Sequence, residues 1–267
     1  MIRLIATDLD GTLLEPNGKL PEGTFEAVRQ LTKMGIRFAA CSGRQYGNLV
    51  RLFGPVADQM AFVCENGALS VLDGEAAGVI ALDDHDAQEI IADIESAGMN
   101  LLISGRHTCY MLDKNRKYTD DIVYRLRNTT TIISSPEEIT EPILKISGQI
   151  DEGLDRIAPI LLAKWGSRLT ATVSGRDWFD ITAANKGMGM QMLMQHMGVK
   201  KEEVVAFGDN FNDETMLDCV GHPFIMAHAN PALLAKGYNV CPKVLPVLAA
   251  LMNARGEEAA LQQWRKA

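Results

Sequence analysis

The sequence predicts an α/β protein with a Rossmann-like parallel-sheet core domain, into which a smaller α+β domain is inserted. Short apolar strands alternate with helical stretches at both ends of the chain, and this alternation is typical of parallel sheets. These strands end in small polar or acidic residues, at the sheet edge where open α/β sheets bind ligands. The order of elements changes within residues 83–183, and this change indicates the inserted domain.

The first strand leads into two acids. An apolar run rich in Ile and Leu is followed by Asp8 and Asp10, and then by Gly11 and Thr12. Such a run is typical of a buried parallel strand. Two carboxylates this close repel each other, so their ionisation implies a cation, a shared proton or phosphoryl transfer. The alternative is a strand that ends in an ordinary Asx turn.

The rest of the N-terminal part continues the alternation of helix and strand. Proline is favoured at helix starts, glycine follows helix ends, and Asp-Gly is typical of hairpin turns. These signals predict a helix between Pro21 and Gly35, a strand over 36–41 ending in Ser42-Gly43-Arg44, a helix over 45–53, a strand over 61–64 ending in Glu65-Asn66-Gly67, and a hairpin over 69–82 about Asp73-Gly74.

Residues 83–183 predict a separate α+β domain with an antiparallel sheet. The predicted helices span 85–97, 118–126 and 154–164; the predicted strands span 100–104, 108–112, 130–134 and 143–150, followed by a pair of strands ending at Ile181. Because Pro159 lies inside the last helical pattern, we expect a kink or a late start there.

The C-terminal part returns to the first pattern, so the core domain is predicted to comprise residues 1–82 and 184–267. A helix opens at 185–187, and we expect Met188, Met192, Leu193 and Met197 to share one face. The other predicted elements are a strand over 204–207 followed by the loop 208–213, a strand over 224–226, and helices over 232–236, 245–253 and 257–266.

Composition limits the partners. The net charge is −8 and the acids and bases are interleaved, which argues against a nucleic-acid or anionic-membrane surface. The longest apolar stretches, such as 244–252, are too short to span a bilayer, and Arg3 and Asp8 lie where a signal peptide needs its apolar core. We expect a monomer or homodimer in the cytoplasm that acts on a small molecule. The five cysteines are scattered in apolar runs, which predicts buried free thiols.

Polar residues collect at the strand ends and at the helix starts facing them: Asp8, Asp10, Ser42, Gly43, Lys186, Asp209, Asn212 and Asp213. Acids that hold a hard cation, a lysine, a hydroxyl and helix N-terminal amides together predict a phosphate site with Mg²⁺. Taken singly, Ser42 is also typical of a helix N-cap and Lys186 of a solvated side chain.

Four motifs occur in a known order: Asp-Leu-Asp-Gly-Thr-Leu-Leu, Cys-Ser-Gly-Arg, Asn-Lys-Gly and Gly-Asp-Asn-Phe-Asn-Asp. They resemble the motifs of the haloacid dehalogenase-type phosphatases over the full length of the chain. The large insertion after Asn66-Gly67-Ala68 resembles the Cof-type sugar-phosphate phosphatase group. The segment 226–229, Met-Ala-His-Ala, departs from the usual Met-Gly-Asn-Ala, and the usual Asp-Gly-Val near the end of the core is missing. These departures leave the substrate open.

The resemblance implies a Mg²⁺-dependent phosphatase that hydrolyses a small phosphorylated metabolite, such as a sugar phosphate, through an aspartyl-phosphate. The inserted domain would act as a lid, or cap. The resemblance implies Asp8 as nucleophile; Asp10 as acid and base; Asp8, the Asp10 carbonyl and Asp209 as metal ligands; Ser42, Gly43, Lys186 and Asn212 as phosphate ligands; and Asp213 as support for Lys186 or a metal-bound water.

Two other functions remain open. A phosphomutase of the same superfamily would return the phosphoryl group to sugar, and a phosphoacceptor regulatory module would use an Asp cluster and a Lys without hydrolysis. The module is disfavoured because it is much shorter and lacks the insertion. We expect Arg44 to anchor its loop. In the cap, the candidates for substrate contact are Arg106, His107, His85 and Trp178.

Overall fold

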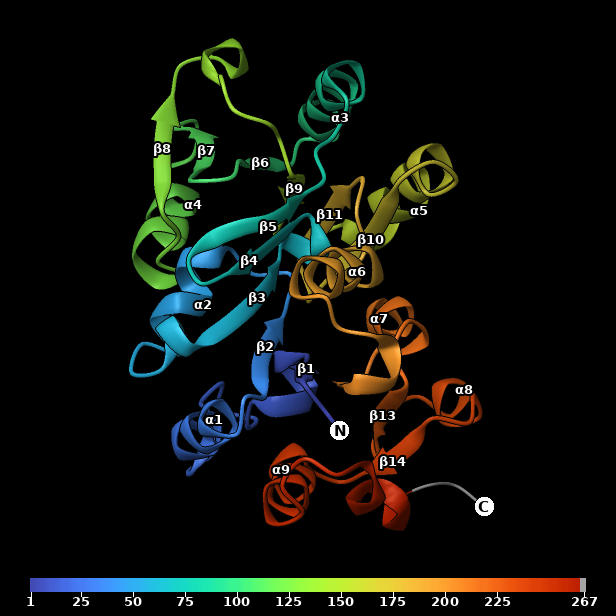
Figure 1. Cartoon of the computed structure of the whole chain (residues 1–267). Coiled ribbons are helices and arrows are strands. Elements are labelled where there is room, and N and C mark those ends of the chain that lie inside the picture. The colour runs from blue at the N-terminus through green and yellow to red at the C-terminus, as the bar shows by residue number, and fades with distance from the viewer. Residues whose placement is uncertain (265–267) are drawn as a thin grey trace. The chain divides into compact units, whose positions relative to one another are not determined.

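The computed structural model describes residues 1–264 and divides the chain into two compact units (Figure 1). The first unit, the core, contains Met1–Gly78 and the chain from Asn185 onward. The second unit, the cap, is Val79–Ala184. Each unit has its own sheet and its own apolar cluster.

The core contains an eight-stranded sheet in the order β14-β13-β12-β1-β2-β3-β4-β5. The strands are β1 (Leu4–Thr7), β2 (Arg37–Cys41), β3 (Met60–Cys64), β4 (Leu69–Leu72), β5 (Glu75–Val79), β12 (Val204–Gly208), β13 (His222–Met226) and β14 (Asn239–Cys241). The six strands from β14 to β3 are parallel, and β4 is antiparallel to β3. The predicted α/β class is therefore confirmed, and β14 is a strand that the sequence pattern did not reveal.

Because β1, β2, β3 and β12 are parallel neighbours, their C-terminal ends lie at one edge of the sheet. The core helices are α1 (Thr24–Lys33), α2 (Tyr46–Leu52), α6 (Lys186–Met197), α7 (Glu214–Asp218), α8 (Pro231–Leu234) and α9 (Val244–Asn253). In Figure 1, α1 and α9 cover one face of the sheet while α6, α7 and α8 lie on the other. The crossovers thus bury both faces, which explains the continuously apolar strands.

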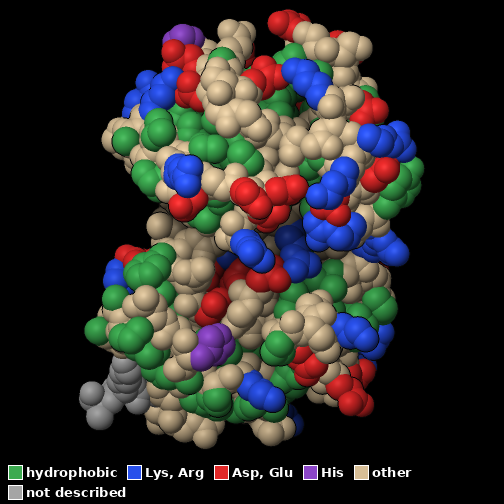
Figure 2. Space-filling model, turned by 180° about the vertical axis from the view of Figure 1, so that it is seen from behind, with side chains coloured by type: hydrophobic (Ala, Val, Ile, Leu, Met, Phe, Trp, Pro, Cys, Tyr) green, Lys and Arg blue, Asp and Glu red, His purple; other side chains and the backbone are tan. Residues whose placement is uncertain are grey.

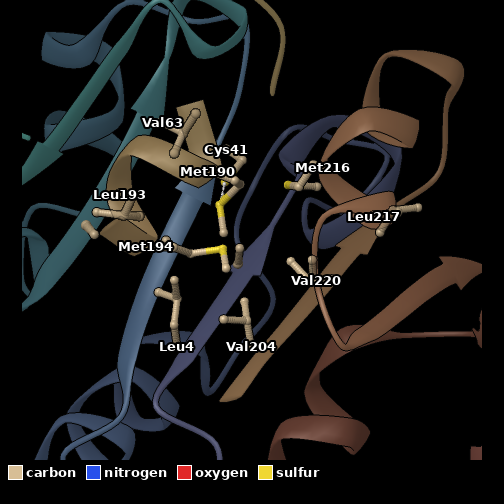
Figure 3. Packing of buried hydrophobic residues seen from close by; sticks show 14 of the residues in the cluster. Leu4, Cys41, Val63, Met190, Leu193, Met194, Val204, Met216, Leu217 and Val220 are labelled. Carbon is tan, nitrogen blue, oxygen red and sulfur yellow. Dashed lines mark hydrogen bonds between the residues drawn. The ribbon is translucent and has the colours of Figure 1, made fainter. Parts of the chain in front are cut away.

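The face under α6 and α7 is an apolar core (Figure 3). Side chains from β1, β2, β3 and β12 pack there against Met190, Leu193 and Met194 of α6. The predicted face of this helix is confirmed for Leu193, which is buried in this cluster, and for Met197, which packs against it, but it is wrong for Met188, which is 38% exposed. Lys186 is buried at the first position of α6, and residues four, seven and eight positions later lie on the same side of a helix. The burial of this lysine therefore determines which methionines face the core.

The cap contains a six-stranded sheet in the order β10-β11-β9-β6-β7-β8. Its strands are β6 (Asn100–Ser104), β7 (Cys109–Leu112), β8 (Thr130–Ile133), β9 (Lys145–Gln149), β10 (Thr170–Ser174) and β11 (Trp178–Thr182). β7 and β8 are parallel, so the predicted antiparallel sheet is mixed. The reason is that α4 (Arg116–Asp120) and the wider turn Asp121–Arg125 form a crossover between them.

The other cap helices, α3 (Asp84–Ser96) and α5 (Leu154–Trp165), contact β6, β9, β10 and β11. Pro159 lies inside α5, so of the two alternatives expected at this proline, a kink or a late start, the late start is wrong. Gly153, in the left-handed region at φ 89°, precedes the helix and allows its start at Leu154.

Short 3₁₀ helices span Ala57–Gln59, Glu65–Gly67, Pro136–Glu138, Lys201–Glu203, Phe211–Asp213 and Glu258–Trp264. The last replaces most of the helix predicted over 257–266, whose final residues lie outside the described chain. The five cysteines, all within the described residues, form no disulfide, as predicted; four of them are buried and Cys219 is half-buried. Acidic and basic side chains are interspersed on the face shown in Figure 2. Among residues 1–264, each helix is too short or too polar to cross a bilayer.

Candidate active site

The loop after β1 holds Asp8 at the edge of the sheet. The Asp8 backbone N–H donates to the carbonyl of Phe207 in β12 (2.9 Å), so the strand pairing extends to the acid itself. Its side chain is buried, with the residue 7% exposed. The chain then turns through Gly11 at φ +88°, where an added Cβ would lie 2.3 Å from Asp209 Oδ2. The loops after β1 and β12 therefore approach each other only because glycine stands there.

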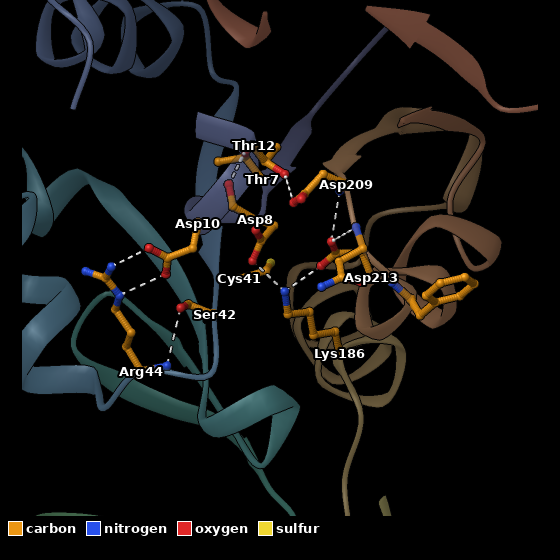
Figure 4. Close-up of polar contacts among 12 residues, drawn as sticks. Thr7, Asp8, Asp10, Thr12, Cys41, Ser42, Arg44, Lys186, Asp209 and Asp213 are labelled. Atoms are coloured by element: carbon orange, nitrogen blue, oxygen red, sulfur yellow. Dashed lines mark hydrogen bonds and ion pairs between the residues drawn. The ribbon is translucent and has the colours of Figure 1, made fainter. Parts of the chain in front are cut away.

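Lys186 lies beside Asp8 at the start of α6. Asn185 caps this helix by accepting from the Met188 N–H (3.0 Å). The Lys186 side chain is 1% exposed, and its Nζ donates to Asp8 Oδ1 (2.5 Å) and Asp213 Oδ1 (2.5 Å). Figure 4 shows this ammonium between the two carboxylates. Its burial rejects the alternative that Lys186 is a solvated surface side chain.

The loop after β12 presents two more acids. Asp213 is completely buried, and its Oδ2 accepts from the backbone N–H groups of Asp209 and Asn210, at 3.0 Å each. Asp209 is half-buried, and its Oδ1 accepts from the Thr12 hydroxyl at 2.7 Å. Both Asp213 oxygens therefore have protein donors, whereas Asp209 faces the β1 loop.

Three acids, Asp8, Asp209 and Asp213, lie around one lysine, Lys186, so the charges of these four side chains do not balance. The pKa of Asp8 is raised to about 7, mainly by burial; Lys186 opposes this shift, and the Asp213 and Asp209 carboxylates add to it. Burial alone would lower the pKa of Lys186, but Asp213 and Asp8 raise it above its usual range. The raised pKa of Asp8 disfavours its ionised form, whereas the raised pKa of Lys186 favours its charged form. The first shift follows mainly from burial, and the second follows from the two neighbouring carboxylates. The site thus has surplus negative charge that another cation would neutralise.

The donor set fits a divalent cation. One carboxylate oxygen each from Asp8, Asp209 and Asp213 lie within 4.8 Å of one another, and oxygen ligands are those that Mg²⁺ prefers. Burial also raises the pKa of Asp209, although the Thr12 hydroxyl opposes this shift. Since Asp213 already accepts three hydrogen bonds, Asp8 and Asp209 are the more available ligands.

The loop after β2 carries the predicted phosphate ligands Ser42 and Gly43. Ser42 is buried, and its N–H donates to the Val63 carbonyl of β3 (2.8 Å). A Cβ on Gly43 would lie 2.9 Å from Asn66 Oδ1, so this loop closely approaches the end of β3. Asn66 adopts a left-handed conformation at φ 56°. Local strain of this kind is frequent at functional sites.

Asp10 is turned differently from Asp8. Its side chain is 62% exposed, and its carboxylate accepts from Arg44 Nη2 (2.6 Å) and Nε (3.1 Å). In Figure 4 it points toward Arg44 and away from Lys186. Asn212 is exposed in the short helix Phe211–Asp213. The structure therefore brings Asp8, Lys186, Asp209 and Asp213 into direct contact or close approach, while Asp10 joins them through the β1 loop.

The cap candidates lie on separate elements. His85 is in the first turn of α3, whereas Arg106 and His107 are exposed between β6 and β7. Trp178 begins β11, and its ring lies near that of Tyr118, with centroids 6.0 Å apart and planes tilted by 41°. Since α3 and the Tyr118 segment belong to different apolar clusters, the structure does not collect these candidates into one group.

Two residues of the site, Thr12 and Asn66, were missed by the sequence reasoning. Thr12 follows Asp10 in the first motif, and its hydroxyl orients Asp209. Asn66 lies against Gly43, and its position before a glycine at a strand end was the available signal. His228 lies close enough for its charge to lower the pKa of Asp209, which places the atypical segment 226–229 near the acids.

Known proteins resemble this chain over most of its length. A family model of haloacid dehalogenase-like hydrolases matches residues 5–244. The chain belongs to this family. It is 28% identical over 240 residues to the 5-amino-6-(5-phospho-D-ribitylamino)uracil phosphatase YbjI of Escherichia coli K12, and 27% identical over 248 residues to an HMP-PP phosphatase of Escherichia coli O8. Both alignments cover 88% of each chain.

Solved structures support the same fold. The HAD subclass IIB sugar phosphatase BT4131 matches with a TM-score of 0.74 and 19% identity, covering 98% of both chains. The prediction of a haloacid dehalogenase-like hydrolase with a Cof-type fold is therefore confirmed, as is the class of phosphoric monoester hydrolase.

Proposed function

We propose that the protein is a Mg²⁺-dependent phosphatase that hydrolyses a small phosphorylated metabolite through an aspartyl-phosphate on Asp8. The observation that carries the proposal is the buried Lys186 shared by Asp8 and Asp213, beside Asp209. A nucleophilic carboxylate, a buried cation and oxygen ligands for a metal ion are the groups that phosphoryl transfer requires.

In the first step, the free Asp8 oxygen attacks phosphorus and the bond to the leaving oxygen breaks. Asp10, in its acid form, donates a proton to that oxygen. In the second step, water attacks phosphorus and gives its proton to the Asp10 carboxylate. The bond to Asp8 then breaks, which releases phosphate and restores the carboxylate. Lys186 keeps Asp8 in place throughout, because its ammonium is held on the opposite side by Asp213.

The remaining residues bind the phosphoryl oxygens and the metal. The buried Ser42 hydroxyl, the Gly43 amide, Lys186 and Asn212 are proposed as phosphate ligands. Asp8, the Asp10 carbonyl and Asp209 would hold Mg²⁺, with Asp213 in support. When bound, the ion would supply positive charge that favours the ionised form of Asp8 and offsets the charge of the phosphate.

The substrate is proposed to be a phosphorylated sugar or a related polyol phosphate. In support, the relative YbjI is named for a phosphate ester on a ribityl chain. Residues 226–229 depart from the usual family sequence, and the cap candidates lie on separate elements. Both features favour a substrate that differs from those of the named relatives. A cytoplasmic location and a monomeric or homodimeric state stay predictions.

The test is a screen of phosphorylated sugars, polyols, nucleotides and pyrimidine phosphates with Mg²⁺, measuring released inorganic phosphate. We expect one group of sugar or polyol phosphates to be hydrolysed at least tenfold faster than the rest, and activity to disappear with EDTA. Equal slow rates on every compound would contradict the sugar-phosphate assignment. An isomeric sugar phosphate without free phosphate would identify the phosphomutase instead.

A further inference from the structure

We infer that Arg44 is a positioning residue for Asp10: its guanidinium holds the carboxylate that carries the proton in one orientation. The inference rests on the proposed function, because it takes Asp10 to be the acid and base. It gives Arg44 a role beyond anchoring its own loop.

The contact between the two side chains is bidentate. Arg44 Nη2 donates to Asp10 Oδ1 (2.6 Å), and Nε donates to Oδ2 (3.1 Å). Two parallel N–H···O bonds from a planar guanidinium determine the position of both oxygens and hence the rotamer of the carboxylate. A lysine would offer a point charge and could not hold the carboxylate plane in this way.

Arg44 is itself held at both ends of its backbone. Its N–H donates to the Ser42 hydroxyl oxygen (3.3 Å), and its carbonyl accepts from the Glu65 N–H (3.2 Å). The loop that presents the proposed phosphate ligand Ser42 therefore also presents the guanidinium that orients Asp10. Phosphate binding and the placement of the proton carrier thus share one rigid loop.

Asp10 needs such a partner because little else surrounds its side chain. Its carboxylate is 62% exposed, unlike that of Asp8, which Lys186 holds in a buried position. Figure 4 shows Asp10 directed toward Arg44 and away from the acids around Lys186. An unrestrained exposed carboxylate would sample several rotamers, and proton transfer requires one of them.

This role predicts an effect on departure of the leaving group and little effect on phosphate binding. General acid catalysis matters for poor leaving groups such as sugar alkoxides, and it matters much less for 4-nitrophenolate. A residue that only maintained the fold would affect both substrates equally, and a residue that bound phosphate would weaken inhibition by inorganic phosphate.

The experiment compares Arg44→Met and Arg44→Lys with the wild type, using the best sugar phosphate of the screen and 4-nitrophenyl phosphate. The matched control is Arg51→Met, the same change in α2, where the guanidinium donates to Asn48 Oδ1 (2.8 Å). We expect Arg44→Met to lower kcat/KM about 10- to 100-fold on the sugar phosphate. We expect changes below about threefold on 4-nitrophenyl phosphate, and likewise in the Ki of inorganic phosphate, with Arg44→Lys in between.

A double mutant tests whether Arg44 acts through its partner. In an Asp10→Asn background, Arg44→Met should add less than about threefold, because the group that it positions is already gone. Equal losses on both substrates, a raised phosphate Ki, or a full additional loss in that background would each overturn the inference while leaving the phosphatase intact. A wild type that releases no phosphate from any ester would instead overturn the proposed function, and the inference with it.

Discussion

Replacing Asp8 with Asn should abolish the activity and yet stabilise the metal-free protein at neutral pH. Burial is the main cause that raises the pKa of Asp8 from 3.8 to about 7, because it outweighs the opposing effect of Lys186, and the Asp213 and Asp209 carboxylates add to it. The folded chain therefore binds this proton more tightly than the unfolded chain does. Its stability is highest below the unfolded pKa and falls as pH rises through the interval from about 4 to 7. A shift of roughly 3 pKa units corresponds to about 4 kcal/mol.

The assay is urea denaturation followed by circular dichroism in EDTA at pH 4.5, 6 and 8. At pH 4.5 much of the destabilisation that results from ionising Asp8 in the folded chain is absent, and at pH 8 nearly all of it is present. The free energy of unfolding of Asp8→Asn, minus that of the wild type, should therefore increase by about 3 kcal/mol between these pH values. Asn keeps the shape of the side chain, and Lys186 retains Asp213.

Asp58→Asn is the matched control, because Asp58 is an exposed carboxylate in the same unit. Its stability relative to the wild type, measured at the same three pH values, gives the change that removal of an exposed carboxylate produces. Saturating Mg²⁺ at pH 8 should stabilise the wild type more than Asp8→Asn. If the difference for Asp8→Asn changed with pH no more than that for Asp58→Asn, the reasoning that the burial of Asp8 destabilises this site would be refuted.

Three further substitutions test the geometry of the site. Gly11→Ala should lower the free energy of unfolding in urea by at least about 2 kcal/mol more than Gly18→Ala does. Both glycines have positive φ, but only at Gly11 would the added Cβ lie 2.3 Å from Asp209 Oδ2. Equal losses would contradict the close approach. Asp213→Asn should lower the free energy of unfolding by about 3 kcal/mol, because it removes a buried charged partner of Lys186. A loss below about 1 kcal/mol in the same assay would mean that this ion pair contributes little to stability. Ser42→Ala should lower kcat/KM about 10- to 100-fold and raise the Ki of inorganic phosphate, and an unchanged Ki would remove Ser42 from the phosphate site.

The strand ends and their motifs were predictable because they depend on local patterns. An apolar run that stops at Asp8, or at Ser42, identifies a strand and the edge where it ends. The Asp73-Gly74 hairpin was predicted equally well, since both residues adopt the positive φ that such a turn requires. Elements recognised in this way agree with the structure to within one or two residues at most of their ends.

Features that depend on neighbours in space were less predictable. Met188 was wrongly placed on the core face of α6, because hydrophobicity alone does not reveal a buried lysine. The cap sheet was expected to be antiparallel throughout, but β7 and β8 are joined by a helical crossover and run parallel. The short strand β14 has a three-residue span, Asn239–Cys241, and its pairing with β13 identifies it.

The sequence by itself determined the α/β class, the order of the motifs and the identity of the acids at the strand ends, because these depend on periodicity and composition. Only the tertiary structure decided how those acids differ. Asp8 is buried against Lys186 with a raised pKa, whereas Asp10, two residues later, is exposed and held by Arg44. Burial and partner geometry arise from segments more than 30 residues away in the chain, which local patterns do not encode.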